Sequence, residues 1–321
     1  MACKENPTIA MYDVYFIVQL IYGAPSIYLW IRIIKAIIID RSHASFAHPF
    51  HRVLAATGII SVIVFINDMI FTRFLLTGRF CTAISSAFSS LTYWLSPTVF
   101  IAMYGIGCQL TGSVLLSLNR LTAVFTIRHT EIWSRYIVIA YIFLFTPSLI
   151  TSWYLIPALT YVKVDATGTG MSIVYVKLFP WISTTLFSLV ICAISGLLIL
   201  IFTGITMLCF KRMRKMTINS SRFERTLFIL GLYQSGSTLI MCIYQLSMYL
   251  LIQAGLTAKL SYLFSVRSFF WDILTLLPAW ATFFTNDPIR KTLGCGTAPR
   301  KSTTASIHLP VSQRVSSMSN L

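Results

Sequence analysis

Seven long apolar runs, separated by short polar segments, constrain most strongly what this chain of 321 residues can fold into. Each run has the length of about 20 residues that an α-helix needs to cross the roughly 30 Å hydrocarbon core of a bilayer. The runs cover residues 14–39, 53–76, 95–118, 136–161, 180–208, 226–252 and 260–284. We therefore expect an all-α integral membrane protein, a seven-transmembrane helix bundle embedded in the lipid bilayer.

The composition agrees with a membrane protein, because only 11% of the residues are charged and 56% are hydrophobic. Soluble domains carry about 25% charged residues. Residues 1–13 are left as a short N-terminal segment and 285–321 as a tail. The tail is rich in Ser and Thr and poor in large apolar residues, so we expect it to be mostly disordered. Cys295, just after the last run, is a candidate for palmitoylation, and a free thiol is the alternative.

The distribution of Lys and Arg predicts the orientation of the bundle. Of the 25 basic residues, 18 fall in the segments on one side and seven on the other, with Arg73 counted among the seven. Since basic residues concentrate on the cytoplasmic side, we expect the N-terminus outside and the C-terminus inside. The net charge of +16 is explained by this topology, so a nucleic-acid partner is not expected.

Enzymatic motifs are absent from the sequence. It has no HExxH, no GxSxG and no phosphate-binding glycine loop, so we expect no enzyme and no cofactor. The cysteines form no CxxC pair, and a group of three histidines in the first inner loop lacks acidic or Cys partners. We therefore expect no metal site.

Ionisable residues inside the runs are the most informative, because a charge at the bilayer centre costs about 2.5–3.5 kcal/mol on insertion scales. Asp68 and Arg267 lie at matching depths in the second and seventh runs. We predict an ion pair between them, with Asn67 and Trp271 beside it; the alternative is that Arg267 extends outward along the lipid surface and Asp68 is protonated or hydrogen-bonded. Asp272 is expected to join a polar network between helices.

Arg120 ends the third run, directly after Asn119. A basic residue at the inner end of a helix first suggests a topology anchor. The same interpretation applies to the basic residues that follow the fifth run, and a surface for a protein partner is the second interpretation. These residues are Lys211, Arg212, Arg214 and Lys215.

The order of these features resembles a seven-helix G-protein-coupled receptor, specifically the nematode serpentine chemoreceptors of class gamma and the related class V. The resemblance covers about residues 10–292. It rests on five short motifs: Leu20-Ile21-Tyr22-Gly23-Ala24-Pro25-Ser26, Leu116-Ser117-Leu118-Asn119-Arg120-Leu121-Thr122-Ala123-Val124, Glu131-Ile132-Trp133, Asp272-Ile273-Leu274-Thr275-Leu276-Leu277-Pro278 and Asn286-Asp287-Pro288-Ile289-Arg290.

The resemblance implies a receptor in the plasma membrane, in the cilia of sensory neurons by family likeness. A small external chemical cue would bias the helices and open an inner cleft for a heterotrimeric G protein, with Arg120 in contact with that partner. Two features depart from rhodopsin-like receptors: Asn119 replaces the acidic residue before the arginine, and the second outer loop, 162–179, has no Cys, so the usual disulfide from the top of the third helix cannot form there.

The outer half of such a bundle is the default ligand pocket. We selected polar and aromatic residues at that depth as ligand-binding candidates: Asn67, Asp68, Tyr104, Tyr244, Gln245, Arg267 and Trp271. Three other classes of protein remain as alternatives. A ligand-gated channel of the insect odorant-receptor kind would place its N-terminus inside, a small transporter would show repeated halves, and a non-signalling membrane partner would tolerate loss of Arg120.

Overall fold

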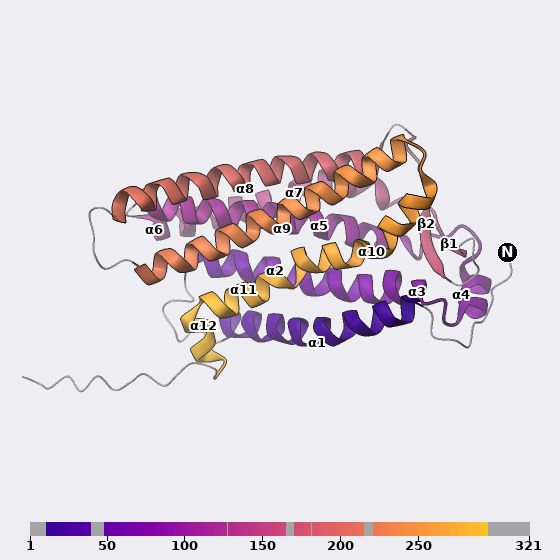
Figure 1. The fold of residues 1–321 in the computed structure, drawn as a ribbon, viewed down its shortest axis with the longest axis horizontal. Coiled ribbons are helices and arrows are strands. Elements are labelled where there is room, and N and C mark those ends of the chain that lie inside the picture. Colours follow the sequence, from indigo (N-terminus) through magenta and orange to yellow (C-terminus); the bar gives the residue numbers. More distant parts are fainter. Residues whose placement is uncertain are drawn as a thin grey trace, which may run out of the picture.

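Long helices run side by side along the long axis of the molecule (Figure 1). The computed structural model describes residues 11–39, 48–126, 128–164, 170–180, 182–214 and 221–294. Six segments of this described part are long and apolar enough to cross a bilayer: Met11–Ile38, Pro49–Leu76, Ser96–Phe125, Ile137–Leu155, Thr184–Cys209 and Gly231–Gln253.

These segments belong to α1 (Met11–Ile38), α2 (Pro49–Asp68) continued by η2 (Met69–Arg73) and α3 (Phe74–Leu76), α5 (Ser96–Phe125), α7 (Ile137–Ser152) continued by η3 (Trp153–Leu155), α8 (Thr184–Arg214) and α9 (Ser221–Gln253). A further pair, α10 (Thr257–Thr275) and α11 (Leu277–Thr285), covers the seventh apolar run.

The seventh run is broken at Leu276. Pro278 has no backbone N–H to continue the hydrogen-bond ladder. The amide of Ala279 therefore bonds to the carbonyl of Leu276 at 3.1 Å. The carbonyl of Thr275 is instead bonded by the indole Nε1 of Trp30 in α1, at 3.0 Å. A neighbouring helix thus satisfies the backbone group that the break leaves free, as broken membrane helices require.

The two ends of the bundle differ (Figure 1). One end, called the hairpin end below, carries α4 (Cys81–Phe88) and the antiparallel strands β1 (Thr160–Val164) and β2 (Met171–Tyr175). The opposite end, called the tail end, carries α6 (His129–Arg135) and α12 (Asp287–Thr292). The expected disordered part of the tail from 297 onward, and Cys295, lie outside the described residues.

The expectation of a helix as far as residue 161 is wrong. The helical part ends at Leu155, and Thr160 already pairs with Tyr175 in the hairpin. Pro157 stops the helix because it lacks an N–H and disfavours helical backbone before it. The residues that follow, Thr-Tyr-Val-Lys-Val, favour a strand. Two backbone hydrogen bonds of 2.8 Å between Thr92 and Thr160 attach this hairpin to the segment before α5.

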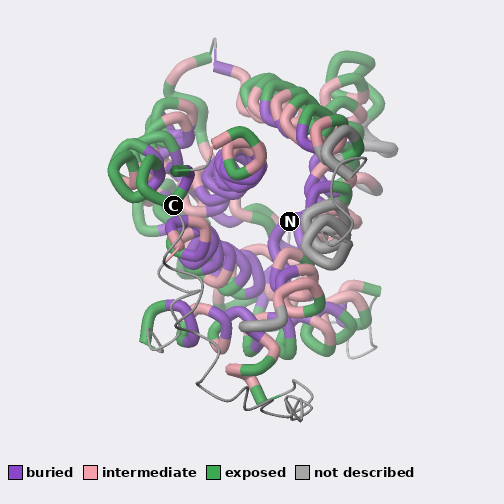
Figure 2. Tube along the Cα trace, turned by 90° about the vertical axis from the view of Figure 1, so that its left-hand side faces the viewer, coloured by how far each residue is buried: buried purple, intermediate pink, exposed green. Residues whose placement is uncertain are grey.

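Exposed residues lie on the outer sides of the helices (Figure 2), and many of them are large and apolar, where a soluble protein would place polar ones. On α8 the exposed large residues recur at helical spacing along one face: Leu186, Val190, Ile194, Leu197, Leu200, Ile201, Ile205 and Leu208. Such a surface is stable in hydrocarbon and would favour aggregation in water. The helices therefore present the surface of a membrane-embedded bundle.

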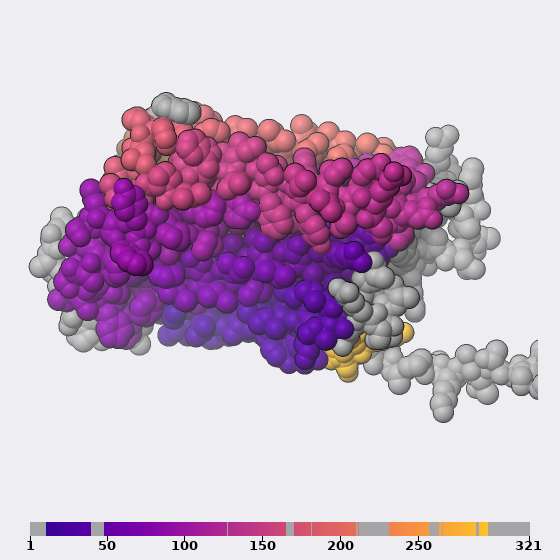
Figure 3. Space-filling view, turned by 180° about the vertical axis from the view of Figure 1, so that it is seen from behind, coloured from indigo at the N-terminus to yellow at the C-terminus, as the bar shows by residue number. Residues whose placement is uncertain are grey.

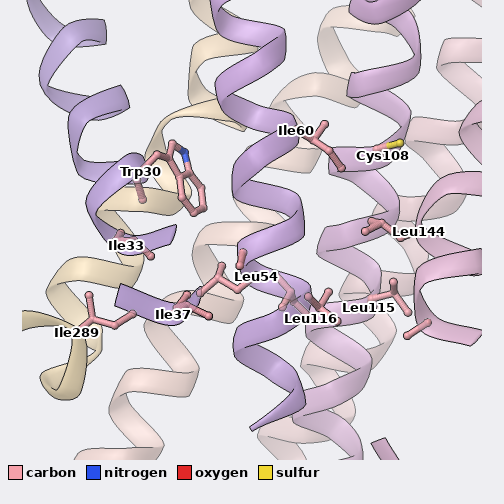
Figure 4. Packing of buried hydrophobic residues seen from close by; sticks show 14 of the residues in the cluster. Trp30, Ile33, Ile37, Leu54, Ile60, Cys108, Leu115, Leu116, Leu144 and Ile289 are labelled. Atoms are coloured by element: carbon pink, nitrogen blue, oxygen red, sulfur yellow. The ribbon is translucent and has the colours of Figure 1, made fainter. Parts of the chain in front are cut away.

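The largest buried cluster joins α1, α2, α5, α6, α7, α11 and α12, and Figure 4 shows part of it. Trp30 is fully buried against Gly58 of α2, where an added Cβ would lie 2.7 Å from the indole ring. At Gly105 of α5 an added Cβ would lie 2.0 Å from Cγ2 of Val64. Small residues at these crossings let the helix backbones approach closely, which is the main source of helix association in lipid.

Candidate functional site

A buried ion network joins three helical segments in the half of the bundle toward the hairpin end. The guanidinium of Arg73 donates from Nε to Oδ2 of Asp68 at 2.7 Å. It also donates from Nη1 and Nη2 to the two carboxylate oxygens of Asp272, at 2.9 and 2.5 Å. The hydroxyl of Tyr22 donates to Oδ2 of the same Asp272. Each of the three guanidinium nitrogens therefore donates to a carboxylate oxygen.

The π-helical turn η2 explains why Arg73 and not another cation reaches Asp68. In an α-helix, residues five apart lie on different faces. In a π-helix the repeat is i to i+5, so Arg73 comes to lie one turn beyond Asp68 on the same face. The guanidinium also lies over the ring of Phe65, 5.0 Å from its centroid. A single local change in helix winding thus brings the positive charge into the bundle.

The predicted ion pair between Asp68 and Arg267 is wrong. Asp68 pairs with Arg73, and the guanidinium carbon of Arg267 instead lies 4.0 Å from the ring centroid of Trp271. Arg73, which the charge count assigned to the outer side, is buried inside the second span. The expectation that Asp272 joins a network between helices is confirmed by its contacts with Arg73 and Tyr22.

A cavity lies next to this network, between α5, α7, η3, α8, α9 and α10. Its empty space, including the mouth, is about 490 Å³, of which about 30 Å³ is open to the centre of a water molecule. Its lining residues are Met103, Ile106, Gly107, Leu110, Thr151, Ser152, Tyr154, Thr184, Phe187, Ser188, Ile191, Cys192, Met241, Gln245 and Trp271. The lining is mostly apolar with a few hydroxyls, which is the usual chemistry of a small-molecule site.

Trp271 contributes an indole side chain, with its N–H donor, to the wall of the cavity. Its side chain is only 4% exposed, and its indole Nε1 is buried with no hydrogen-bond partner among the described residues. A buried donor without an acceptor costs about 1–3 kcal/mol. A ligand that carries a hydrogen-bond acceptor would recover that cost on binding. Trp271 thus brings to the cavity wall a buried N–H donor that has no described acceptor.

Only two of the seven predicted ligand residues, Gln245 and Trp271, line the cavity. Asn67 donates to the backbone carbonyl of Thr98 at 3.0 Å, so its amide serves helix packing. The other aromatic candidates stack on neighbours and do not line the cavity: Tyr104 on Phe100 at 5.2 Å and Tyr244 on Phe270 at 5.0 Å between ring centroids. Asp68 and Arg267 have the partners given above.

Sequence reasoning missed the hydroxyl residues that α7 and α8 contribute to the cavity, which are Thr151, Ser152, Thr184 and Ser188. The only signal for them was small polar residues inside apolar runs. Such residues are frequent in membrane helices because they bond to their own backbone. Thr151 and Ser152 indeed each bond to a carbonyl in the turn before them, at 3.0 and 2.6 Å.

Arg120 lies near the tail end of α5, at the opposite end of the bundle from the hairpin. Its side chain is 5% exposed, and none of its guanidinium nitrogens has a hydrogen-bond partner in the described part of the chain. Its nearest aromatic contact is Phe50, with 5.8 Å between the guanidinium carbon and the ring centroid. On α9, an added Cβ at Gly231 would lie 3.9 Å from Nη1. A full positive charge is therefore held between α2, α5 and α9 without a described counter-ion.

No acidic side chain in the described part of the chain pairs with the guanidinium of Arg120. Asn119 is also buried, and its Nδ2 has no partner among the described residues. One turn earlier, the hydroxyl of Ser117 donates to Oε1 of Gln234 on α9 at 3.4 Å, which is a long, weak bond. Of the four basic residues after the fifth run, Lys211 is exposed; the side chains of Arg212 and Arg214, and Lys215 as a whole, lie outside the described part.

Two histidines stack at the tail end. The rings of His48, just before α2, and His129 in α6 lie 4.8 Å apart and nearly parallel, at 27°. Nδ1 of His48 accepts a hydrogen bond from the backbone amide of Phe50 at 3.2 Å, which caps α2. Burial lowers the pKa of both imidazoles, and the neighbouring His129 lowers the pKa of His48 further. The neutral rings thus join the starts of α2 and α6.

Cys81 at the hairpin end is disulfide-bonded, and its partner is not among the described residues. The other described cysteines carry free thiols: Cys108, Cys192, Cys209 and Cys242. The described part of the second outer loop contains no cysteine, so the covalent constraint at this end differs from a bond between the third helix and that loop. The hairpin is attached instead by backbone and hydroxyl hydrogen bonds, such as that from Ser96 to the carbonyl of Ala158.

Comparison with known proteins agrees with the family that the motifs indicate. The family model described as Srg family chemoreceptor matches residues 16–293. Serpentine receptor class gamma-69 of Caenorhabditis elegans is 26% identical over 84% of this chain and 78% of its own length. Class gamma-10 and class gamma-5 receptors of the same organism are 24% and 23% identical over 90% and 81% of this chain, and over 87% and 79% of their own lengths.

The matched model also decides between the two nematode classes in favour of class gamma. It covers all seven apolar runs apart from the first residues of the first. Since it spans most of the chain, this protein belongs to the Srg family of chemoreceptors and is a seven-transmembrane helix bundle.

Proposed function

We propose that this chemoreceptor is a G-protein-coupled receptor of the plasma membrane. A small external cue binds in the cavity beside Trp271, and a heterotrimeric G protein binds at the tail end. The hairpin end faces outside and the tail end faces the cytoplasm. The observation that carries this proposal is that two of the buried polar groups without a described partner, Trp271 Nε1 and the guanidinium of Arg120, lie toward opposite ends of one bundle.

The state of Arg120 supports coupling at the tail end. Taking a charge out of water without a partner costs several kcal/mol. An acceptor inserted from outside, such as a carboxylate or the carbonyl end of a partner's helix, would remove that cost. Movement of α9 away from α5 would give such an acceptor access, since the guanidinium is buried and an added Cβ at Gly231 of α9 would lie 3.9 Å from its Nη1. A partner that contacts Arg120 therefore stabilises the open arrangement selectively, which is what signalling requires.

Charges on the surface of the tail end support the same orientation. Among the described residues this end carries Arg128, Arg135, Lys211, Arg290 and Lys291. Basic residues are concentrated on the cytoplasmic side of membrane proteins. Lys211, together with Arg212, Arg214 and Lys215, would form a basic rim for the G protein. Palmitoylation of Cys295 and delivery to sensory cilia belong to the same proposal.

The proposal is tested by G-protein activation in cells that express the receptor, using Arg120→Ala, Arg120→Lys and the matched control Arg128→Ala. Arg128 is an exposed arginine at the same end. We expect Arg120→Ala to remove ligand-evoked activation without loss of surface protein, and Arg128→Ala to leave it. Equal activation by Arg120→Ala and wild type would refute a coupling role for Arg120.

The channel alternative differs in orientation and is tested separately. A short tag at the N-terminus should be accessible to antibody on intact cells. Labelling that needs permeabilised cells, with surface delivery confirmed by another label, would reject the receptor topology and favour an inverted channel. The transporter alternative predicts ligand uptake into vesicles, whereas the receptor should bind its ligand without transport.

A further inference from the structure

The walls of the cavity show how an occupant reaches it. α7 and α8 both pack on α5, and α7 and α8 pack little on each other. Both nevertheless contribute to the cavity wall, with Thr151 from α7 and Thr184, Phe187 and Ser188 from α8. Phe187 is 38% exposed on the outer surface of α8. α7 and α8 lie along the upper edge of the face seen in Figure 3. The two helices thus approach each other at few points along the seam between them, and Phe187 at this seam is exposed on the outer surface.

Toward the hairpin end, residues of the cavity wall are hydrogen-bonded to the hairpin. The hydroxyl of Tyr154 donates to Oγ1 of Thr184 at 3.1 Å, and the hydroxyl of Tyr175 in β2 bonds to the same Oγ1. These bonds connect η3, the hairpin and the start of α8. A hydrophobic cluster centred on Tyr154, Leu155 and Ile182 packs around them. Aromatic rings and hydrogen bonds thus lie at the end of the cavity toward the hairpin.

The lining also restricts the charge of the occupant. No Lys, Arg, His, Asp or Glu is among the described residues that line the cavity, although Asp272 and Arg267 adjoin or contact Trp271. A charged ligand would lose its hydration there without a partner of opposite charge. A neutral ligand with one acceptor would satisfy Nε1 of Trp271 and fill the apolar remainder.

From these observations we infer that the ligand is a neutral, lipophilic molecule with a single hydrogen-bond acceptor, and that it reaches Trp271 from the bilayer through the seam between α7 and α8. This inference rests on the proposed receptor function and specifies its ligand class and route. Since only about 30 Å³ is open to the centre of a water molecule, a chain of several carbons requires the seam to widen.

The ligand class is tested by photolabelling of the full-length receptor in phosphatidylcholine vesicles. The probe is a long-chain 2-ketone that carries a diazirine, with 2-heptanone and heptanoate as competitors of equal chain length. We expect labelled peptides from residues 148–155 and 184–192, competition by 2-heptanone, and little competition by the anionic heptanoate at neutral pH. Labelling that neither competitor reduces, or that both reduce equally, would overturn the inference.

The role of Trp271 is tested with Trp271→Phe, which removes the N–H and keeps a ring. Loss of this bond should weaken 2-heptanone competition about tenfold. Trp153→Phe is the matched control, because Trp153 is 44% exposed on η3 and does not line the cavity. Equal competition in Trp271→Phe and wild type would remove Trp271 from the site.

The route is tested by joining the two helices across the seam. Thr151→Cys/Phe187→Cys treated with a bifunctional methanethiosulfonate should be labelled several-fold more slowly, and dithiothreitol should restore the rate. The two single variants, treated in the same way, control for native thiols. An unchanged rate in the crosslinked double variant would refute the lateral route. These readouts do not involve the G protein, so the inference can fail while coupling through Arg120 stands, and the reverse.

Discussion

Removing the positive charge of Arg73 should destabilise the bundle more than any other single change in the ion network. Arg73→Met keeps most of the side-chain volume but leaves Asp68 and Asp272 buried without their cation. Breaking a buried pair by removing one partner costs about 3–5 kcal/mol. Two carboxylates lose their partner here, so we expect the upper part of that range. Asp272→Asn should cost less, about 1.5–3 kcal/mol, because the pair of Arg73 and Asp68 survives.

Arg267 provides the contrast that the structure predicts. It stacks on Trp271 and forms no ion pair with an acidic side chain in the described part of the chain. Arg267→Met should therefore cost about 0.5–1 kcal/mol, the size of a cation–π contact at a partly exposed site. Reversing the charges of Asp68 and Arg267 together should not restore the folded protein, because the true cation of the network is Arg73.

Thermal unfolding of the receptor in detergent, followed with a thiol-reactive fluorescent dye, measures these differences. Cys108 and Cys192 are free and buried, so they react only as the bundle opens. The triple variant Asp68→Asn/Arg73→Met/Asp272→Asn should recover much of the loss, since no charge then remains to be desolvated. If Arg267→Met lowers the midpoint as much as Arg73→Met does, or the triple variant shows no recovery, the ion network does not have the role argued here.

Two further predictions concern packing and pH. Gly105→Ala places a Cβ 2.0 Å from Val64 Cγ2 and should lower the free energy of unfolding by about 1–3 kcal/mol in the same assay. Gly204→Ala, with nothing within 4 Å of the added Cβ, should be neutral. Equal unfolding midpoints for the two variants would contradict the close approach of α2 and α5. The pKa values of His48 and His129 in the folded protein lie below the ordinary value. In acid the unfolded chain therefore binds more protons than the folded protein does. The contribution of the two histidines to stability is present above about pH 6.5 and is lost as the pH falls below it. The unfolding midpoint should therefore fall on acidification, and His48→Phe/His129→Phe should show a flatter pH profile; a profile identical to wild type would exclude the stacked pair as its source.

The number of spans was predictable because their signal is length and apolarity, which the sequence displays directly. The end of the fourth span was also readable, since Pro157 and the strand-favouring residues after it stop a helix before residue 161. The position of Arg73 inside the bundle was not predictable from the sequence. A π-turn such as η2 has no sequence signature, and with ordinary winding this residue would not reach Asp68.

The cavity was predictable only in part, because depth along a helix can be counted while its rotation cannot. Counting placed Gln245, Trp271, Tyr104 and Tyr244 at suitable depths, and only the first two line the cavity. Rotation is fixed by contacts between distant segments, such as the crossing of Gly105 with Val64. The lack of an acidic partner for Arg120 was anticipated from Asn119, a neighbour in sequence.

The break at Leu276 divides the seventh span into two rods with different attachments. At 1.5 Å per residue, α10 is about 28 Å long and α11 about 13 Å. α11 is held to α1 by the bond from Trp280 Nε1 to Ser26 Oγ at 2.9 Å. α10 carries Trp271 at the cavity and Asp272 in the ion network. A pivot of about 5° at the break would leave α11 in place and displace the far end of α10 by about 2.4 Å, whereas Trp271, five residues from Leu276, would move by only about 0.7 Å. A motion that remains small at the cavity is therefore enlarged toward the hairpin end.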